Sequence, residues 1–412
     1  MSLVSIIIPN YNQTQFICSA IESVLSQTYH SYEIIVVDDG STDDSWQVIG
    51  GYGDQVRYIW QENQGLGGAR NTGILASKGE MIGLLDADDQ WLPDYLETMV
   101  ALADQKPDAD VFYCQAQAMD KNGQDLPQKF GGLPLPPDKI YQTLLRANFL
   151  IPSTILMRRA PIISNGLFDQ TIRSMHGCED WDLWLRLLNT TPRYIFIGSP
   201  ACLVRYRLHG NSLSVNPTSM QGAVRAVIEK HFGSDDGERG DWSWEKRRAY
   251  GGVYRYYAIT SVQRMNDWQL AGQYLGQAFQ ADPSLADDLD LFYELGLGSQ
   301  SAGYRGTAYQ LELEENAKHL NTLLEEIFSL PKTLELEYLR PRIYGTAYFA
   351  LGLIAYNTCF RALTRRFLSR ALYYRPKLFC DTLVIGDWIK SLIPRSMVQM
   401  IKGPSKNVIN ER

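Results

Sequence analysis

The stretch Gly79-Glu80-Met81-Ile82-Gly83-Leu84-Leu85-Asp86-Ala87-Asp88-Asp89-Gln90 sets the architecture expected for this chain. Its apolar run ends abruptly in carboxylates, which predicts a buried strand that delivers three aspartates to the edge of a sheet. Side chains alternate along a strand, so Asp86 and Asp88 are expected on the same side, where they can share one divalent cation or ligand. An aspartate-rich turn without a ligand is the alternative for this stretch taken alone.

Three further apolar runs precede this stretch, and each is followed by turn or polar residues. They span residues 3–8, 33–37 and 56–60, with helical patterns between them. This alternation predicts a mostly parallel α/β sheet flanked by helices, in which ligands bind beyond the carboxyl ends of the strands. We therefore expect Pro9-Asn10-Tyr11 and Asp38-Asp39 to meet Asp86 and Asp88 at one edge. The glycines near Gly65 lack both GxGxxG spacing and a Walker lysine, which argues against dinucleotide and P-loop enzymes.

Length and charge limit the classes of protein that fit. The 412 residues, 45% of them hydrophobic, predict two or three domains. The formal net charge of -7 argues against a nucleic-acid binder. From Arg340 onward, thirteen Lys and Arg residues stand against three acidic residues, a net charge of +10, so the preceding part carries -17. This asymmetry suggests attraction to an anionic membrane surface or an acidic partner, and a solvated helical face is the alternative.

The cysteine pattern and the hydropathy of the chain bear on its compartment. Six cysteines without CxxC spacing predict free thiols in a reducing compartment. The N-terminal segment lacks the pattern of a signal peptide, and no apolar run reaches the roughly 18–20 residues that a membrane-spanning helix needs. The expected location is the cytoplasm. The alternative is a cytoplasmic protein that contacts the inner face of the membrane peripherally.

Four motifs follow one another along the chain: Val4-Ser5-Ile6-Ile7-Ile8-Pro9-Asn10-Tyr11-Asn12, Val36-Val37-Asp38-Asp39-Gly40-Ser41-Thr42-Asp43, Gly68-Ala69-Arg70-Asn71-Thr72-Gly73 and Leu85-Asp86-Ala87-Asp88-Asp89. In order and separation they resemble the signatures of the inverting family 2 glycosyltransferases, which have a GT-A-type fold. The resemblance covers about residues 1–214 and implies a nucleotide-sugar-binding catalytic domain at 1–232.

The resemblance also implies how a nucleotide diphosphate sugar, most often a UDP-sugar, is held. The implied nucleotide-binding residues are Pro9, Tyr11, Asp39, Arg70 and Asp86. The implied ligands of Mn²⁺ or Mg²⁺ are Asp88 and His209, although a lone histidine is as often a hydrogen-bonded structural residue. The residues expected near the acceptor or the diphosphate are Glu179, Arg207 and His176.

The pair Glu179-Asp180 opens a helical pattern, where acids are favoured simply by the positive end of the helix. Members of the resembled family carry a Glu-Asp pair here, and its second acid is the general base. The resemblance therefore implies that Asp180 takes the proton of an acceptor hydroxyl while that oxygen displaces the nucleotide and inverts the anomeric centre.

The chain changes character beyond Ser214, where helical patterns dominate. Residues 248–283 can be laid over residues 342–376, since both begin Arg-x-Tyr-Gly and place Ala278 and Ala371 where helices would pack closely. We expect an all-α domain at 241–412 with tetratricopeptide-like helix pairs, serving partner docking, membrane approach or dimer formation. The segment from Leu383 to Pro394 has the composition of a bilayer-surface helix, with core packing as the commoner explanation.

The combined hypothesis is a metal-dependent inverting glycosyltransferase that uses a glycan or lipid-linked acceptor in polysaccharide biosynthesis. A non-catalytic scaffold that binds a nucleotide sugar and docks partners through its helices is the alternative. A nucleotidyltransferase fits less well, because the first strand is not followed by a basic glycine-rich loop for a triphosphate.

Overall fold

The computed structural model describes residues 2–131, 134–171, 177–210, 217–301, 303–304, 306–308, 310–329 and 336–380. They form two compact units, the first extending to Val253 and the second beginning at Tyr254, while Tyr304 returns to the first. The boundary falls within helix α9 (Trp244–Met265).

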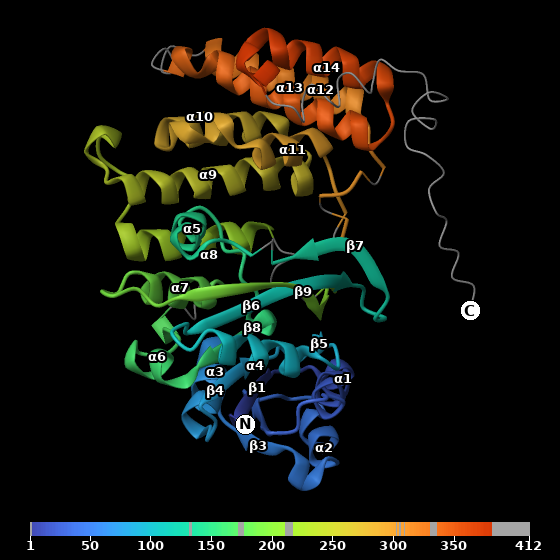
Figure 1. The fold of residues 1–412 in the computed structure, drawn as a ribbon, viewed down its shortest axis with the longest axis vertical. Coiled ribbons are helices and arrows are strands. Elements are labelled where there is room, and N and C mark those ends of the chain that lie inside the picture. Colours follow the sequence, from blue (N-terminus) through green and yellow to red (C-terminus); the bar gives the residue numbers. More distant parts are fainter. Residues whose placement is uncertain are drawn as a thin grey trace. The chain divides into compact units, whose positions relative to one another are not determined.

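The first unit is built on a nine-stranded sheet in the order β3-β2-β1-β4-β8-β6-β9-β5, with β7 paired to β6 (Figure 1). The strands are β1 (Val4–Asn10), β2 (Tyr32–Asp38), β3 (Arg57–Trp60), β4 (Met81–Leu84), β5 (Gln90–Trp91), β6 (Val111–Met119), β7 (Asp125–Phe130), β8 (Ile155–Arg158) and β9 (Phe196–Arg207). The four strands predicted from the apolar runs are parallel neighbours, which confirms the α/β fold class. Antiparallel pairing of β8 with β4 and β6 makes the sheet mixed farther along.

Both faces of the parallel part are covered by helices, and β1 is buried at every one of its positions. Ile6 and Ile8 of β1 pack in one core cluster with α1 (Thr14–Leu25) and α4 (Tyr95–Gln105). Ile7 points to the other face, toward α3 (Gly65–Ala76). A Cβ atom on Gly73 of α3 would lie 2.4 Å from Ile7 Cγ2, so glycine is what allows this close approach.

The remaining helices of the first unit complete the connections between strands. They are α2 (Ser45–Gly50), α5 (Pro137–Leu144), α6 (Arg159–Ser164), α7 (Glu179–Leu188) and α8 (Pro217–Phe232). α7 begins at the predicted Glu179-Asp180 pair, and its buried face includes Trp181 and Trp184.

The described elements of the second unit are helical, as the sequence predicts for this region. After α9 they include α10 (Trp268–Ala281), α11 (Leu289–Leu297), α12 (Leu313–Ser329), α13 (Arg340–Asn357) and α14 (Arg361–Tyr374). Their tetratricopeptide-like character stays a prediction. In the described part of the chain no helix is long and apolar enough to cross a bilayer, and the segment from Leu383 to Pro394 lies outside the described residues.

Candidate active site

The carboxyl ends of β1, β2 and β4 meet where the strand order reverses around β1. Asn10 pairs with Asp38 at the ends of β1 and β2, and β4 runs parallel on the other side of β1. Chains leaving such strands diverge in opposite directions and open a crevice for ligands. Pro9 is buried at the end of β1, whereas Tyr11 follows the strand with half of its surface exposed.

Asp39 fixes the entry to α3 beside this crevice. Its Oδ1 accepts hydrogen bonds from Gln61 Nε2 at 2.7 Å and from the backbone N–H of Gln64 at 2.8 Å. Its Oδ2 accepts from the N–H of Gly65 at 2.8 Å. Since a carboxylate has about four acceptor positions, little capacity is left for a nucleobase. The nucleotide-binding role of Asp39 stays a prediction.

Arg70 joins two carboxylates that are far apart in the sequence. Its side chain is 1% exposed, and its Nη2 lies 2.7 Å from Asp86 Oδ1 while its Nη1 lies 2.5 Å from Glu179 Oε1. This buried cation ties the end of β4 to the start of α7. Burial raises the pKa of Asp86, and the positive charge of Arg70 opposes that rise.

Asp180 is the next residue of α7 and is 8% exposed. Its Oδ2 accepts a hydrogen bond from Asn148 Nδ2 at 2.8 Å. Burial, followed by the negative charge of Glu179, raises the pKa of Asp180 to about 7. A carboxylate with a pKa in this range both holds and releases a proton near neutral pH, as a general base must. His176 lies outside the described residues.

Asp88 contacts two basic residues from the predicted site, Arg207 at the end of β9 and His209 just beyond it. Its Oδ2 lies 2.9 Å from His209 Nε2, and its backbone carbonyl accepts a hydrogen bond from Arg207 Nε at 2.7 Å. The guanidinium of Arg207 also lies 4.7 Å above the ring of Phe16. Burial lowers the pKa of Arg207. The predicted residues Asp88, Arg207 and His209 are therefore brought together.

The sequence reasoning missed two residues, Ser153 and Asn148, that form hydrogen bonds with these acidic residues. Ser153 Oγ donates to Asp89 Oδ2 at 2.6 Å and accepts from the N–H of Asp86 at 3.1 Å. Asp89, which is fully buried, also accepts from the N–H of Arg207 at 2.8 Å. Burial, with the nearby charge of Asp88, raises the pKa of Asp89 well above its usual range. No local sequence pattern marks Ser153, or Asn148 beside Asp180; their contacts reveal them.

The predicted nucleotide-binding residues and the acidic residues are only partly joined by direct contacts. Among the described residues, no hydrogen bond or ion pair links Asp39 to Asp86, Asp88 or Asp180. Asp39 instead holds the first turn of α3, the helix that carries Arg70.

The donor set around Asp88 bears on the implied metal. Within the part of the chain that the structure describes, no group of three or more His, Cys, Asp or Glu side chains is arranged to hold an ion. Asp88 and His209 offer one carboxylate and one imidazole in contact. Such an incomplete set fits a hard cation that takes its remaining ligands from diphosphate and water.

Comparison with known proteins identifies relatives of the first unit. Residues 5–165 match the family described as Glycosyl transferase family 2. An uncharacterised glycosyltransferase of Rickettsia typhi is 33% identical over 215 residues, 50% of this chain and 64% of that protein. The chain thus spans less than two thirds of this relative.

Another relative, from Escherichia coli, is matched over most of its length. It is the UDP-Glc:alpha-D-GlcNAc-diphosphoundecaprenol beta-1,3-glucosyltransferase WfaP, 32% identical over 221 residues, 52% of this chain and 81% of the relative. Among solved structures, S. aureus TarS 1-349 gives a TM-score of 0.48 at 18% identity, covering 87% of this chain and 92% of that one.

Proposed function

This chain belongs to glycosyl transferase family 2, and from that membership we propose that it transfers a sugar from a UDP-sugar to a glycan or lipid-linked acceptor in polysaccharide biosynthesis. The donor and acceptor classes follow the name of the relative WfaP, which uses UDP-Glc and a diphosphoundecaprenol-linked sugar. The first unit would carry the reaction, since the described candidate site residues belong to it. The four motifs that resemble the signatures of this family support the proposal that the chain is a sugar transferase.

The observation that carries the proposal is the buried Asp180 carboxylate, whose pKa lies near 7. In its charged form it accepts the proton of an acceptor hydroxyl while that oxygen bonds to the anomeric carbon of the donor. The bond from this carbon to the diphosphate breaks on the opposite side, and its electron pair leaves with UDP. One such displacement inverts the anomeric configuration.

The neighbouring residues have supporting roles in this proposal. The ion pairs of Arg70 hold Glu179, and with it the start of α7, close to Asp86 in the segment that follows β4. The proposed nucleotide contacts are Pro9, Tyr11, Asp39, Arg70 and Asp86. Arg207 and His176 are proposed to approach the diphosphate or the acceptor. A divalent cation, Mn²⁺ or Mg²⁺, held by Asp88 and His209 would offset the charge that develops on the leaving diphosphate.

The test is UDP release from a panel of UDP-sugars with Mn²⁺ and a mixed set of glycan and lipid-linked acceptors. Asp180→Asn keeps the shape of the side chain and its contact with Asn148 but removes the proton acceptor. We expect it to lower turnover by at least about 100-fold, while calorimetry shows donor binding within a few-fold of the parent. Asp138→Asn, at an exposed acid in the first turn of α5, is the matched control.

Two results would contradict the proposal. Turnover of Asp180→Asn within about tenfold of the parent would assign the base to another residue. Donor binding without UDP release from any tested sugar would favour the non-catalytic scaffold. Removal of metal by EDTA should lower turnover, and added Mn²⁺ should restore it if Asp88 and His209 hold the ion.

A further inference from the structure

The basic charge of the second unit is concentrated in one short region. Residues 340–380 include eight Lys and Arg residues and no Asp or Glu. The part of the chain that precedes Arg340 carries a net charge of -17. A chain of this overall sign is repelled from an anionic surface unless its cations are gathered on one face.

Ion pairs within the unit neutralise the arginines at the ends of this region. Arg340 Nη1 lies 2.7 Å from Glu337 Oε1, at the start of α13. Arg342 and Arg375 both pair with Asp287, the latter with an N–O distance of 3.0 Å. These three arginines already have carboxylate partners, so surplus positive charge must come from other cations of the region, such as the arginines within α14.

The sequence of α14 sorts its apolar and basic residues onto opposite faces. The buried positions are Thr364, Phe367, Leu368, Ala371 and Leu372. Contact with α13 is close, since a Cβ atom on Gly352 would lie 2.4 Å from Leu368 Cδ2. The exposed positions are Ala362, Arg365, Arg366, Ser369, Arg370 and Tyr373. Steps of three and one along a helix place these residues on one outward side, which we call the α14 face.

The cations of the α14 face are weakly engaged. Arg366 lies 3.9 Å from Glu314, and both side chains are more than half exposed, so this pair is worth little. Arg370 Nη1 donates to the hydroxyl of Tyr348 at 2.9 Å, a neutral partner. Arg365 is exposed and forms no ion pair with any residue of the described part of the chain. Three positive charges therefore face solvent together.

An aromatic side chain lies on the same face as these cations. Tyr373 is 79% exposed, and Phe360, which directly precedes α14, is 48% exposed. Exposed rings of this size beside arginines suit the boundary between lipid headgroups and acyl chains, where an aromatic side chain buries its apolar body and keeps its polar edge in water.

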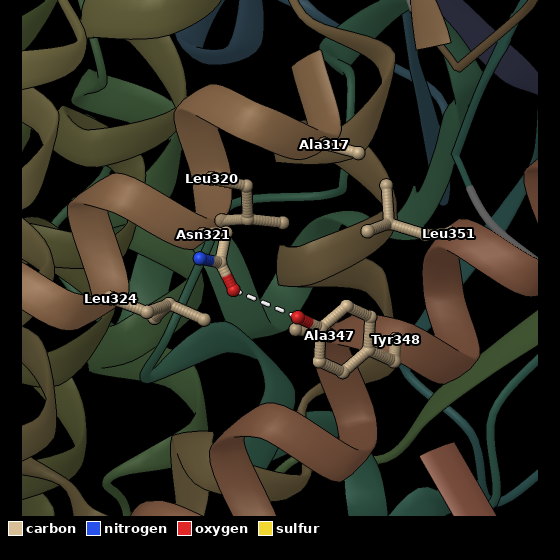
Figure 2. Close-up of a pocket in the computed structure, with 7 residues that line it drawn as sticks. All are labelled: Ala317, Leu320, Asn321, Leu324, Ala347, Tyr348 and Leu351. Atoms are coloured by element: carbon tan, nitrogen blue, oxygen red, sulfur yellow. Dashed lines mark hydrogen bonds between the residues drawn. The ribbon is translucent and has the colours of Figure 1, made fainter. Parts of the chain in front are cut away.

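The α14 face offers a surface rather than a pocket. A cavity of about 10 Å³ lies between α12 and α13, where Tyr348 donates a hydrogen bond to Asn321 at 2.8 Å beside Leu320 (Figure 2). That volume holds about one water molecule, too little for a sugar ring or an amino-acid side chain. Arg365 and Arg366 are exposed and do not line this cavity, and Arg370 contacts it only through the hydroxyl of the lining residue Tyr348. An extended, flat partner suits this arrangement better than a small ligand.

We propose that the α14 face binds the headgroups of an anionic phospholipid bilayer. Arg365, Arg366 and Arg370 would donate charge-assisted hydrogen bonds to lipid phosphates, and Tyr373 would insert its ring at headgroup depth. The contact needs neither donor sugar nor acceptor, so it stands or falls independently of the proposed transfer reaction.

The test is flotation of the full chain with vesicles of phosphatidylcholine, with or without phosphatidylglycerol. We expect binding only to the anionic vesicles, and weaker binding as salt is added. Each arginine lost should lower the partition coefficient about fivefold, so R365Q/R366Q should lower it roughly 30-fold. K106Q/K139Q removes two exposed charges of the first unit and is the matched control. Tyr373→Ser, which keeps every charge, should also weaken binding.

Each variant should unfold at the same temperature as the parent, which will show that a loss of vesicle binding is not caused by misfolding. The proposal is overturned if the parent ignores anionic vesicles, if R365Q/R366Q binds within about threefold of the parent, or if the lysine control loses as much binding. A soluble acidic polysaccharide should not be bound more tightly than the vesicles. Tighter binding of that polymer, with R365Q/R366Q losing only that interaction, would assign the face to an acidic glycan instead.

Discussion

Two aspartates of the first unit show how burial and hydrogen bonds together set the pKa of a carboxyl group. Asp180 and Asp182 lie two positions apart on α7, yet their pKa values move in opposite directions. Burial raises the pKa of Asp180, where one amide donor faces the carboxylate. Burial would do the same to Asp182, but hydrogen bonds from His231, Lys230 and Arg186 hold its pKa well below the usual range. Asp182 is thus a permanently charged anchor, whereas Asp180 can exchange a proton.

The pH dependence of turnover follows from the environment of Asp180. The proposed general base acts as a carboxylate, so kcat/KM should rise with pH, reach half of its maximum at about 7 and level off at higher pH. Asn148→Ala removes a donor that stabilises the charged form, so the inflection should move to higher pH. The measurement is a pH–rate profile for both proteins.

The exposed loop variant Asn122→Ala serves as the control and should leave the inflection in place. An inflection that stays put or moves to lower pH in Asn148→Ala would mean that another group controls the rate.

Among the secondary-structure elements, two helix pairs of the second unit share features beyond their sequence likeness. Asn266 turns from α9 to α10 with φ of 52°, and Cys359 turns from α13 to α14 with φ of 64°. Ala278 of α10 and Ala371 of α14 are both fully buried. Each pair ends at a proline that opens a 3₁₀ turn. These features are consistent with the internal repeat inferred from sequence.

The packing of α3 on β1 leads to a stability prediction. Gly73→Ala gains helix propensity of up to about 1 kcal/mol, but its Cβ would lie 2.4 Å from Ile7 Cγ2 and 3.3 Å from Val37 Cγ2. Overpacking of this kind typically costs about 1–3 kcal/mol, so we expect a net loss of roughly 1 kcal/mol or more in the free energy of unfolding. Urea denaturation provides the measurement.

Gly222→Ala supplies the comparison for this variant, since the added Cβ at this exposed position of α8 would meet nothing within 4 Å. It should stabilise the first unit by about 0.5–1 kcal/mol. If Gly73→Ala is as stable as Gly222→Ala, the close approach of α3 to β1 does not require glycine at position 73.

Across the whole molecule, the described chemistry and the surplus basic charge belong to different units. The contacts of Arg70, Asp88 and Asp180 are made within the first unit. The exposed arginines of the α14 face belong to the second. The proposed donor binding thus belongs to one unit and the proposed lipid contact to the other.

Hydrogen exchange can test this division. Addition of UDP and Mn²⁺ should slow exchange in peptides that cover the ends of β1, β2, β4 and β9, because a ligand held there stabilises local hydrogen bonds. Peptides from α10 to α14 should exchange as before. Mass spectrometry of the exchanged peptides gives the measurement, and protection confined to the second unit would place the nucleotide elsewhere.

The sequence was sufficient for the parallel α/β core, the order of its motifs and the helical character of the later region. Local patterns carry this information, because strand alternation, helical spacing and turn residues each depend on neighbours in the chain. Family 2 membership was likewise readable from four short motifs. The resemblance also implied that Asp88 and His209 bind a metal; the structure places the two side chains in contact, and the metal role stays a prediction.

The burial of each acid and the identity of its partners depended on folding. Asn148 beside Asp180, Ser153 between Asp86 and Asp89, and the joining of Glu179 to Asp86 through Arg70 are contacts between segments distant in sequence. The antiparallel pairing of β8 with β4 and β6, which makes the sheet mixed, also joins segments distant in sequence and depended on folding. A pKa depends on the dielectric and charges surrounding a group in space, and no spacing along the chain encodes that environment.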